Sequence, residues 1–163
     1  MKELSMLAYE ENPEGVERAD LVVGLPSHNE AENIAHPTEQ AARSLIDHFG
    51  DKNSVIVNCD NHSEDGTKEV FLQTTTEVPK IYLSTPAGTV GRGYNLRNLA
   101  AKAVELQAQA VIVVDADLKY ITSSWIKNLG EPIFAGFGFV APLYVRHKYD
   151  GAVANCLVYP LTR

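Results

Sequence analysis

The chain has 163 residues, 45% of them hydrophobic and 21% charged, which is the composition of an ordinary globular protein with one buried core. Its net charge of −7 argues against a nucleic-acid-binding protein, which would normally carry a basic face. No apolar run approaches the ~18 residues of a membrane span, and the two cysteines give neither a disulfide framework nor a metal-ligand spacing. Because the charged first 19 residues contain no signal peptide, we expect a cytoplasmic protein.

The beginning of the chain is polar, and the first buried element follows it. Residues 1–19 form a polar lead-in with some helical tendency at residues 4–9, and we expect the folded domain over residues 20–163. Residues 20–25 are almost continuously apolar, which predicts a buried strand that ends at Pro26.

A helix, a second strand and a short helix are predicted next. The helical pattern ends at Gly50, and Pro37 within it predicts a helix that is broken or begins late. Residues 54–59 form the second strand, which leads into the polar turn 60–67 and a short helix over residues 68–74.

Another strand and the longest amphipathic helix come before the most informative segment. Residues 80–83 read as a third strand, and residues 84–93 form a loop rich in glycine, threonine and proline. Residues 94–107 place apolar side chains at helical spacing and predict a strong helix.

The fourth strand ends in two carboxylates. Residues 111–114 are apolar, and Asp115 and Asp117 follow them with one residue between. Side chains two apart on an extended backbone point the same way, and ligands bind at the carboxyl ends of strands in open α/β sheets. Two such carboxylates suit a hard cation such as Mg²⁺ or Mn²⁺. Taken alone, the tripeptide is more often an Asp-rich turn or a helix cap.

The last part of the chain is less regular. Residues 123–129 predict a helix, residues 138–143 predict another strand, and residues 146–163 have no decisive pattern. The chain stops at Arg163 without a C-cap glycine or a polar tail, so we expect it to be the front portion of a longer protein. The alternation of strands and helices predicts an α/β fold, a mostly parallel twisted sheet with helices on both faces.

Four polar motifs occur at the strand ends and helix starts of this pattern. They are Pro26-Ser27-His28-Asn29-Glu30, the segment from Asp60 to Thr67, Gly91-Arg92-Gly93 and Asp115-Ala116-Asp117. Their order resembles that of GT-A type glycosyltransferases, in particular the family 2-like enzymes, and looks closest to the glucosyl-3-phosphoglycerate and mannosylglycerate synthase group. Asn61 and His62 stand where the family pattern has Asp-Gly, and Arg92 stands where lysine is usual. The resemblance covers about residues 20–160 and implies a Rossmann-like nucleotide-binding half.

The resemblance implies a donor site for a UDP- or GDP-linked hexose. The residues that it assigns to this site are Pro26, Glu30, Asp60, Gly91, Arg92 and Asp115. Glu30 and Asp60 would hold the base and ribose, because carboxylates accept hydrogen bonds from base N–H groups and ribose hydroxyls. Asp115 would lie near the ribose and phosphate.

The resemblance also implies a catalytic centre and an acceptor site. Asp117 would bind the Mg²⁺ or Mn²⁺ that bridges the diphosphate, and Arg92 would help to stabilise the leaving group. The hexose would pass, with retention of configuration, to a small anionic acceptor such as (phospho)glycerate. The basic cluster Arg146, His147 and Lys148 is the candidate for holding that acceptor.

Other interpretations remain open at this point. Glu30 could be an acid favoured by a helix dipole, Arg92 could be a solvated surface charge, and Asp65 belongs to a structural turn. The chain could be a non-catalytic nucleotide-binding fragment, or a metal-dependent phosphohydrolase with Asp115 as nucleophile. The sequence does not choose between UDP and GDP, glucose and mannose, or Mg²⁺ and Mn²⁺. An uncovered sheet edge or apolar face would give a homo-oligomer.

Overall fold

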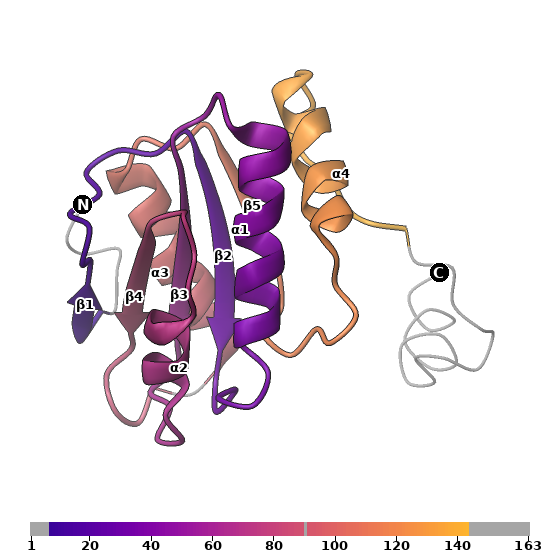
Figure 1. The fold of residues 1–163 in the computed structure, drawn as a ribbon. Helices are drawn as coiled ribbons and strands as arrows, with labels where there is room; N and C mark the ends of the chain where they lie inside the picture. Colours follow the sequence, from indigo (N-terminus) through magenta and orange to yellow (C-terminus); the bar gives the residue numbers. More distant parts are fainter. Residues whose placement is uncertain (1–6, 90, 144–163) are drawn as a thin grey trace, which may run out of the picture.

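The computed structural model describes residues 7–89 and 91–143, in which five strands and four helices alternate along most of the chain (Figure 1). The strands are β1 (Tyr9–Glu11), β2 (Leu21–Ser27), β3 (Ser54–Asp60), β4 (Lys80–Ser84) and β5 (Ala110–Val113). The helices are α1 (Ala35–Phe49), α2 (Thr67–Gln73), α3 (Arg92–Glu105) and α4 (Ser123–Phe134).

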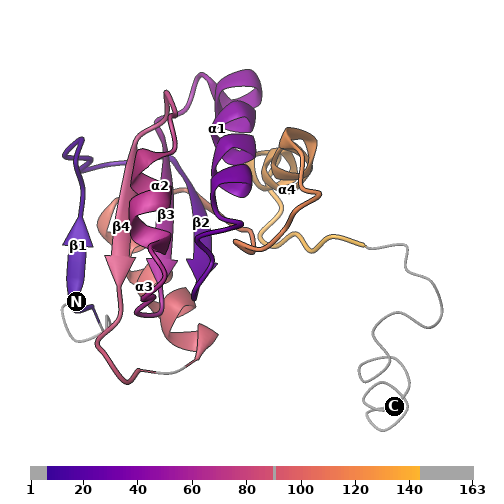
Figure 2. The ribbon, with the colours of Figure 1, turned by 60° about the horizontal axis from the view of Figure 1, so that its bottom comes forward.

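The strands form one sheet in the order β1-β4-β3-β2-β5. Strands β2 to β5 are parallel. Strand β1 runs antiparallel to β4 at one edge, as their arrows in Figure 2 show. In β2, Leu21 lies opposite Ser54 of β3 on one side and Ala110 of β5 on the other. The chain therefore builds outward from β2 on one side and then crosses to its other side at β5.

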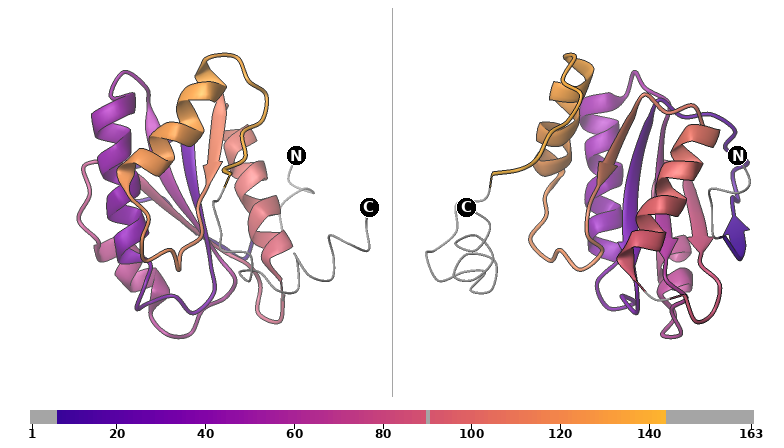
Figure 3. Two further views of the ribbon diagram at one scale, coloured as in Figure 1. Left: turned by 90° about the vertical axis from the view of Figure 1, so that its right-hand side faces the viewer. Right: turned by 180° about the vertical axis from the view of Figure 1, so that it is seen from behind.

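Helices cover both faces of the sheet, as predicted from the alternation of elements (Figure 3). Helices α1, α2 and α4 pack on one face, around a core that includes Leu25, Phe71 and Ile126. Helix α3 packs on the other face, where Leu99 contacts the core of that side. Gly24 permits this approach, because a Cβ added there would lie 2.1 Å from a methyl carbon of Leu99. The predicted fold class is confirmed.

Some local predictions were wrong or displaced. The helical tendency at residues 4–9 fails at Tyr9, which begins β1, and residues 1–6 lie outside the described part of the chain. Residues 138–143 form no strand. Helix α1 begins late, as expected, because Pro37 is tolerated in a first helical turn. Helix α4 continues through Pro132, beyond its predicted end.

Within residues 7–89 and 91–143, no helix is long and apolar enough to cross a membrane.

Candidate functional site

A polar cleft lies beside β2, where the order of strands switches from one side of this strand to the other. Strand β2 connects to its neighbour β3 on one side, whereas β5, the last strand, pairs with its other side. Such a switch in strand order opens a crevice at the carboxyl ends of the strands, where α/β proteins bind ligands. The cleft found there has a volume of about 190 Å³. It is lined by Pro26, Ser27, His28, Glu30, Asn61, Arg92, Asn95, Asp115 and Asp117.

The loop after β2 supplies one wall of the polar cleft. The backbone N–H of Glu30 donates to Thr67 Oγ1 at 2.8 Å, and Glu30 Oε2 accepts from Asn33 Nδ2 at 2.7 Å. The Nδ1 atom of His28 lies 2.9 Å from the carbonyl oxygen of Asn61. A carbonyl oxygen only accepts hydrogen bonds, so Nδ1 carries a proton and donates it. These hydrogen bonds thus connect the loop to the residue that follows β3 and to the first residue of α2.

The turn after β3 is a structural support for this loop. Asp65 Oδ2 accepts from the backbone N–H of Ala31 at 3.0 Å, and Oδ1 accepts from the backbone N–H of Thr67 at 3.0 Å. Burial acts to raise the pKa of Asp65, but these hydrogen bonds and one from the Thr67 hydroxyl outweigh it and hold the pKa below its ordinary value. Gly66 takes a positive φ of 92° just before α2, a conformation that glycine adopts without strain.

Asp60 lies behind the cleft, fully buried at the end of β3. Its Oδ1 accepts from the hydroxyls of Ser27 at 2.7 Å and Ser63 at 2.6 Å. Its Oδ2 accepts from the backbone N–H of Ser63 at 2.7 Å and the Tyr82 hydroxyl at 3.0 Å. Burial, and then the charge of Asp60, raise the pKa of Tyr82, so its hydroxyl stays a donor. A direct contact between Asp60 and a ligand stays a prediction, and it would require one of these bonds to be given up.

Asn61 joins the end of β3 to the start of α3. In the amide orientation that satisfies both ends of the side chain, Nδ2 donates to Thr89 O at 2.5 Å and Oδ1 accepts from the backbone N–H of Gly91 at 3.1 Å. Gly91 has a φ of 123° and is the N-cap residue of α3. Arg92 is therefore the first residue of the helix, two residues earlier than predicted.

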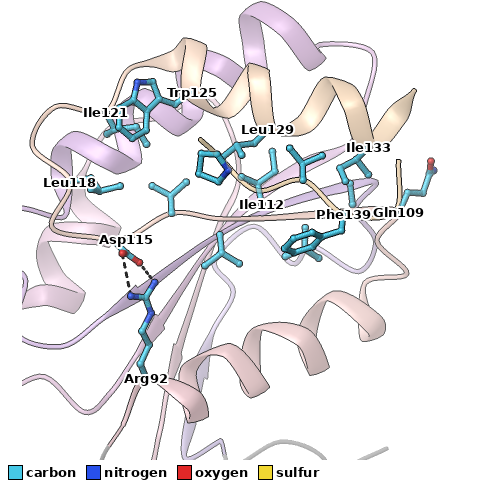
Figure 4. A pocket seen from close by; sticks show the side chains of 17 residues that line it. Arg92, Gln109, Ile112, Asp115, Leu118, Ile121, Trp125, Leu129, Ile133 and Phe139 are labelled. Carbon is cyan, nitrogen blue, oxygen red and sulfur yellow. Dashed lines mark hydrogen bonds and ion pairs between the residues drawn. The ribbon is translucent and has the colours of Figure 1, made fainter. Parts of the chain in front are cut away.

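The carboxylate pair occupies the opposite wall of the cleft. Ala116 is buried, whereas Asp115 is partly exposed and Asp117 is exposed. The guanidinium of Arg92 forms an ion pair with Asp115, in which Nη1 donates to Oδ2 at 3.2 Å and Nη2 donates to Oδ1 (Figure 4). Thus, Arg92 from one predicted motif meets Asp115 and Asp117 from another in the same cleft.

A larger apolar groove of about 420 Å³ adjoins the polar cleft. It lies between β5, α4 and residues 138–142, and Figure 4 shows its apolar walls with the Arg92–Asp115 pair at one end. Apart from Arg92 and Asp115, the labelled side chains on its walls in Figure 4 are apolar or aromatic, except for Gln109. Because the chemically active groups converge on the smaller space, the polar cleft is the candidate functional site.

Comparison with known families agrees with this geometry. The family model described as Glycosyl transferase family 2 matches residues 22–155, which include the whole polar cleft. The chain belongs to glycosyl transferase family 2. Membership implies a transferase that takes its sugar from a nucleotide-sugar donor. No curated protein matches the chain.

Members of family 2 commonly use a divalent metal, and the donor chemistry of this cleft fits one. Asp115 and Asp117 offer the oxygen ligands that Mg²⁺ and Mn²⁺ prefer. Within the described ranges, no group of three or more His, Cys, Asp or Glu side chains could hold a metal ion. A cation bound here would therefore take its other ligands from water or from phosphate oxygens, which is usual for Mg²⁺.

Four lining residues of this transferase cleft were not predicted as site residues, namely Ser27, His28, Asn61 and Asn95. His28 and Asn61 lie inside predicted motifs, so their positions were available from the sequence, but their contacts depend on the meeting of two loops. Asn95 donates from Nδ2 to Ser27 O at 3.1 Å, and its buried oxygen has no partner among the described residues. A water or ligand hydroxyl would satisfy that oxygen. The predicted acceptor residues Arg146, His147 and Lys148 lie outside the described residues.

Proposed function

We propose that this family 2 transferase moves a hexose from a UDP- or GDP-linked donor to a small anionic acceptor such as (phospho)glycerate. The reaction would depend on Mg²⁺ or Mn²⁺ and would retain the configuration of the sugar. The observation that carries the proposal is the convergence of Glu30, Arg92, Asp115 and Asp117 on one cleft at the switch point of the sheet.

The walls of the cleft suggest how a nucleotide would lie. Glu30 and the loop that begins at Pro26 would face the base and ribose, and Asp60 would hold that loop through Ser63 or contact the base itself. Ser63 supports this route, because its hydroxyl bonds Asp60 and accepts from the backbone N–H of Asn29 at 2.7 Å. A nucleoside diphosphate in this orientation would direct its phosphates toward Gly91.

The start of α3 suits the diphosphate. The first backbone N–H groups of a helix have no partners inside the helix, and the helix dipole favours an anion there. Gly91 and Gly93 have open space where a Cβ would lie, so a phosphate could approach the backbone closely. Arg92 adds a guanidinium whose planar donors match phosphate oxygens.

The chemistry follows from the charge that leaves with the nucleotide. When bound at Asp117, a divalent cation would supply Lewis-acid neutralisation of the departing diphosphate. Arg92 would donate hydrogen bonds to the same phosphates, and Asp115 would orient the ribose or a cation-bound water. With leaving-group stabilisation of this kind, no protein nucleophile is required. The acceptor hydroxyl would attack the anomeric carbon on the face from which the sugar–phosphate bond breaks, and its proton would pass to the departing diphosphate.

The test is a transfer assay on the 163-residue chain. UDP- and GDP-linked glucose and mannose are offered with glycerate or 3-phosphoglycerate and Mn²⁺, and the anomeric configuration of any product is read by NMR. We expect one donor to give a product that retains its configuration, with a loss of at least about a hundredfold in Asp117→Asn, since removing one preorganised electrostatic group costs about that much.

The controls separate the alternatives. Arg43→Gln, on the exposed surface of α1, should transfer as wild type does, because its contact is an exposed pair with Asp47. Nucleotide binding without transfer would favour a non-catalytic binding domain. Hydrolysis of a generic phosphate ester that is lost in Asp115→Asn would favour a phosphohydrolase. Inversion of the sugar would overturn the proposed mechanism.

A further inference from the structure

The ion pair between Arg92 and Asp115 joins two elements that the chain supplies separately. Arg92 opens α3 and Asp115 follows β5, and both residues line the polar cleft and the apolar groove. Both terminal nitrogens of the guanidinium contact the carboxylate, one on each oxygen. The pair therefore lies at the boundary between the two cavities, and Figure 4 shows it at one end of the apolar groove.

This contact occupies two groups that the proposed reaction requires for other purposes. While Arg92 is paired, its guanidinium donates its two hydrogen bonds to the carboxylate of Asp115 and not to a phosphate. While Asp115 is paired with Arg92, Asp117 is the other carboxylate of the motif Asp115-Ala116-Asp117 and the one left for a cation. Among the described residues, Asp117 has no hydrogen bond or ion pair of its own. A positive guanidinium at this position also repels a second positive charge.

We propose that Arg92 and Asp115 form an exchangeable pair that couples cation binding to diphosphate binding. This inference rests on the proposed function. In the free protein, each residue neutralises the other. When a nucleoside diphosphate enters with a cation, Arg92 transfers its hydrogen bonds to the phosphate and Asp115 is released toward the cation or its water shell. The cation alone is disfavoured, because it would have to displace Arg92 without supplying an anion in its place.

Because the pair is exposed, such an exchange requires little free energy. The side chain of Arg92 is 57% exposed and that of Asp115 is 39% exposed. Exposed ion pairs contribute little to stability, since water solvates the separated charges well. Opening the pair therefore leaves two well-solvated groups, and the exchange can proceed without disturbing the sheet or α3.

The experiment measures binding of Mn²⁺ alone by electron paramagnetic resonance, in the absence of nucleotide. We expect wild-type chain to bind Mn²⁺ weakly and Arg92→Gln to bind it about tenfold more tightly, because a nearby positive charge is removed and Asp115 is released. Binding of UDP and GDP with Mn²⁺ present should weaken in the same variant. Unchanged or weaker Mn²⁺ binding by Arg92→Gln would overturn the proposal.

A double-mutant cycle distinguishes partner exchange from a general change in charge. In an Asp115→Asn background, Arg92→Gln should raise Mn²⁺ affinity by clearly less than tenfold, because it still removes a positive charge but the carboxylate that it would release is absent. An unchanged tenfold gain in that background would show long-range repulsion only and would reject the pair. Arg43→Gln makes the same change in net charge on α1, and it should leave Mn²⁺ affinity as in wild type.

The variants must be folded for these results to count. Far-ultraviolet circular dichroism and thermal melting of each variant are compared with wild type, and small differences are expected because the pair is exposed. If wild type binds neither nucleotide even with Mn²⁺, the proposed function fails. The Mn²⁺ affinities of the variants still test whether Arg92 and Asp115 act as a pair, so failure of the proposed function and failure of the proposed exchange are distinguishable.

Discussion

Removal of the Asp60 carboxylate tests whether this residue is a structural support of the cleft. In Asp60→Ala, the hydroxyls of Ser27 and Tyr82, each 4% exposed, lose their acceptor, and the N–H and hydroxyl of Ser63 lose theirs. A hydrogen bond to a charged group contributes about 1.5–3 kcal/mol, and each orphaned buried donor costs about 1–3 kcal/mol. These effects overlap, so we expect a loss of about 3–5 kcal/mol in the free energy of unfolding.

The assay is urea denaturation followed by circular dichroism, and two variants calibrate it. Tyr82→Phe removes one of the four hydrogen bonds and should cost about 1–2 kcal/mol. Combined with Asp60→Ala, Tyr82→Phe should cost less than it does alone, because the hydroxyl has already lost its partner. Asp47→Ala removes an exposed carboxylate of α1 and should change stability by less than about 0.5 kcal/mol.

A loss below about 1 kcal/mol in Asp60→Ala would refute the reasoning, because this buried carboxylate accepts four hydrogen bonds, two of them from the buried hydroxyls of Ser27 and Tyr82. If that small loss came with loss of nucleotide binding, Asp60 would instead be a direct ligand of the base. A large loss of stability places its main role in holding Ser63 and the loop after β2.

Three further predictions concern stability. Lys80 is buried, and its Nζ donates to carbonyl oxygens at the end of α2. Lys80→Met should therefore lower the free energy of unfolding, measured by urea denaturation, by about 2 kcal/mol. A free energy of unfolding equal to that of wild type would contradict this. Gly24→Ala should cost about 1–3 kcal/mol, because the new methyl group overlaps Leu99, and an unchanged melting temperature would show that α3 moves aside freely. The pKa of Asp65 is lowered in the fold, so its contribution is present above the unfolded pKa and is lost as pH falls through the folded pKa. The stability difference between wild type and Asp65→Asn should therefore be constant above about pH 5 and shrink below about pH 4, and a difference that grew on acidification would contradict it.

The central part of the fold was predictable because its strands are buried on both faces. Strands β2, β3 and β4 have burial patterns that are almost continuous, and such strands read as uninterrupted apolar runs. The order of polar motifs at their carboxyl ends likewise predicted that Glu30, Arg92, Asp115 and Asp117 would lie close together, and all four line the cleft. These signals are local in sequence, and the parallel sheet brings the strand ends together.

The missed elements depend on contacts between distant segments. Strand β1 has the sequence Tyr-Glu-Glu, which carries no apolar alternation, and it is held by pairing with β4. Ion pairs from Lys102 to Glu10 at 2.6 Å and from Lys68 to Glu11 at 2.8 Å add to this contact. The burial of Asp60 was equally hidden, because Tyr82, one of its donors, belongs to no recognisable motif.

The most direct test of the donor site is a calorimetric titration of the chain with UDP and GDP, with and without Mn²⁺, beside Asp117→Ala. We expect one nucleotide to bind in the presence of Mn²⁺, and this binding should weaken at least about tenfold when Mn²⁺ is left out or Asp117 is replaced. Failure of a folded chain to bind either nucleotide, or equal binding by Asp117→Ala, would contradict it.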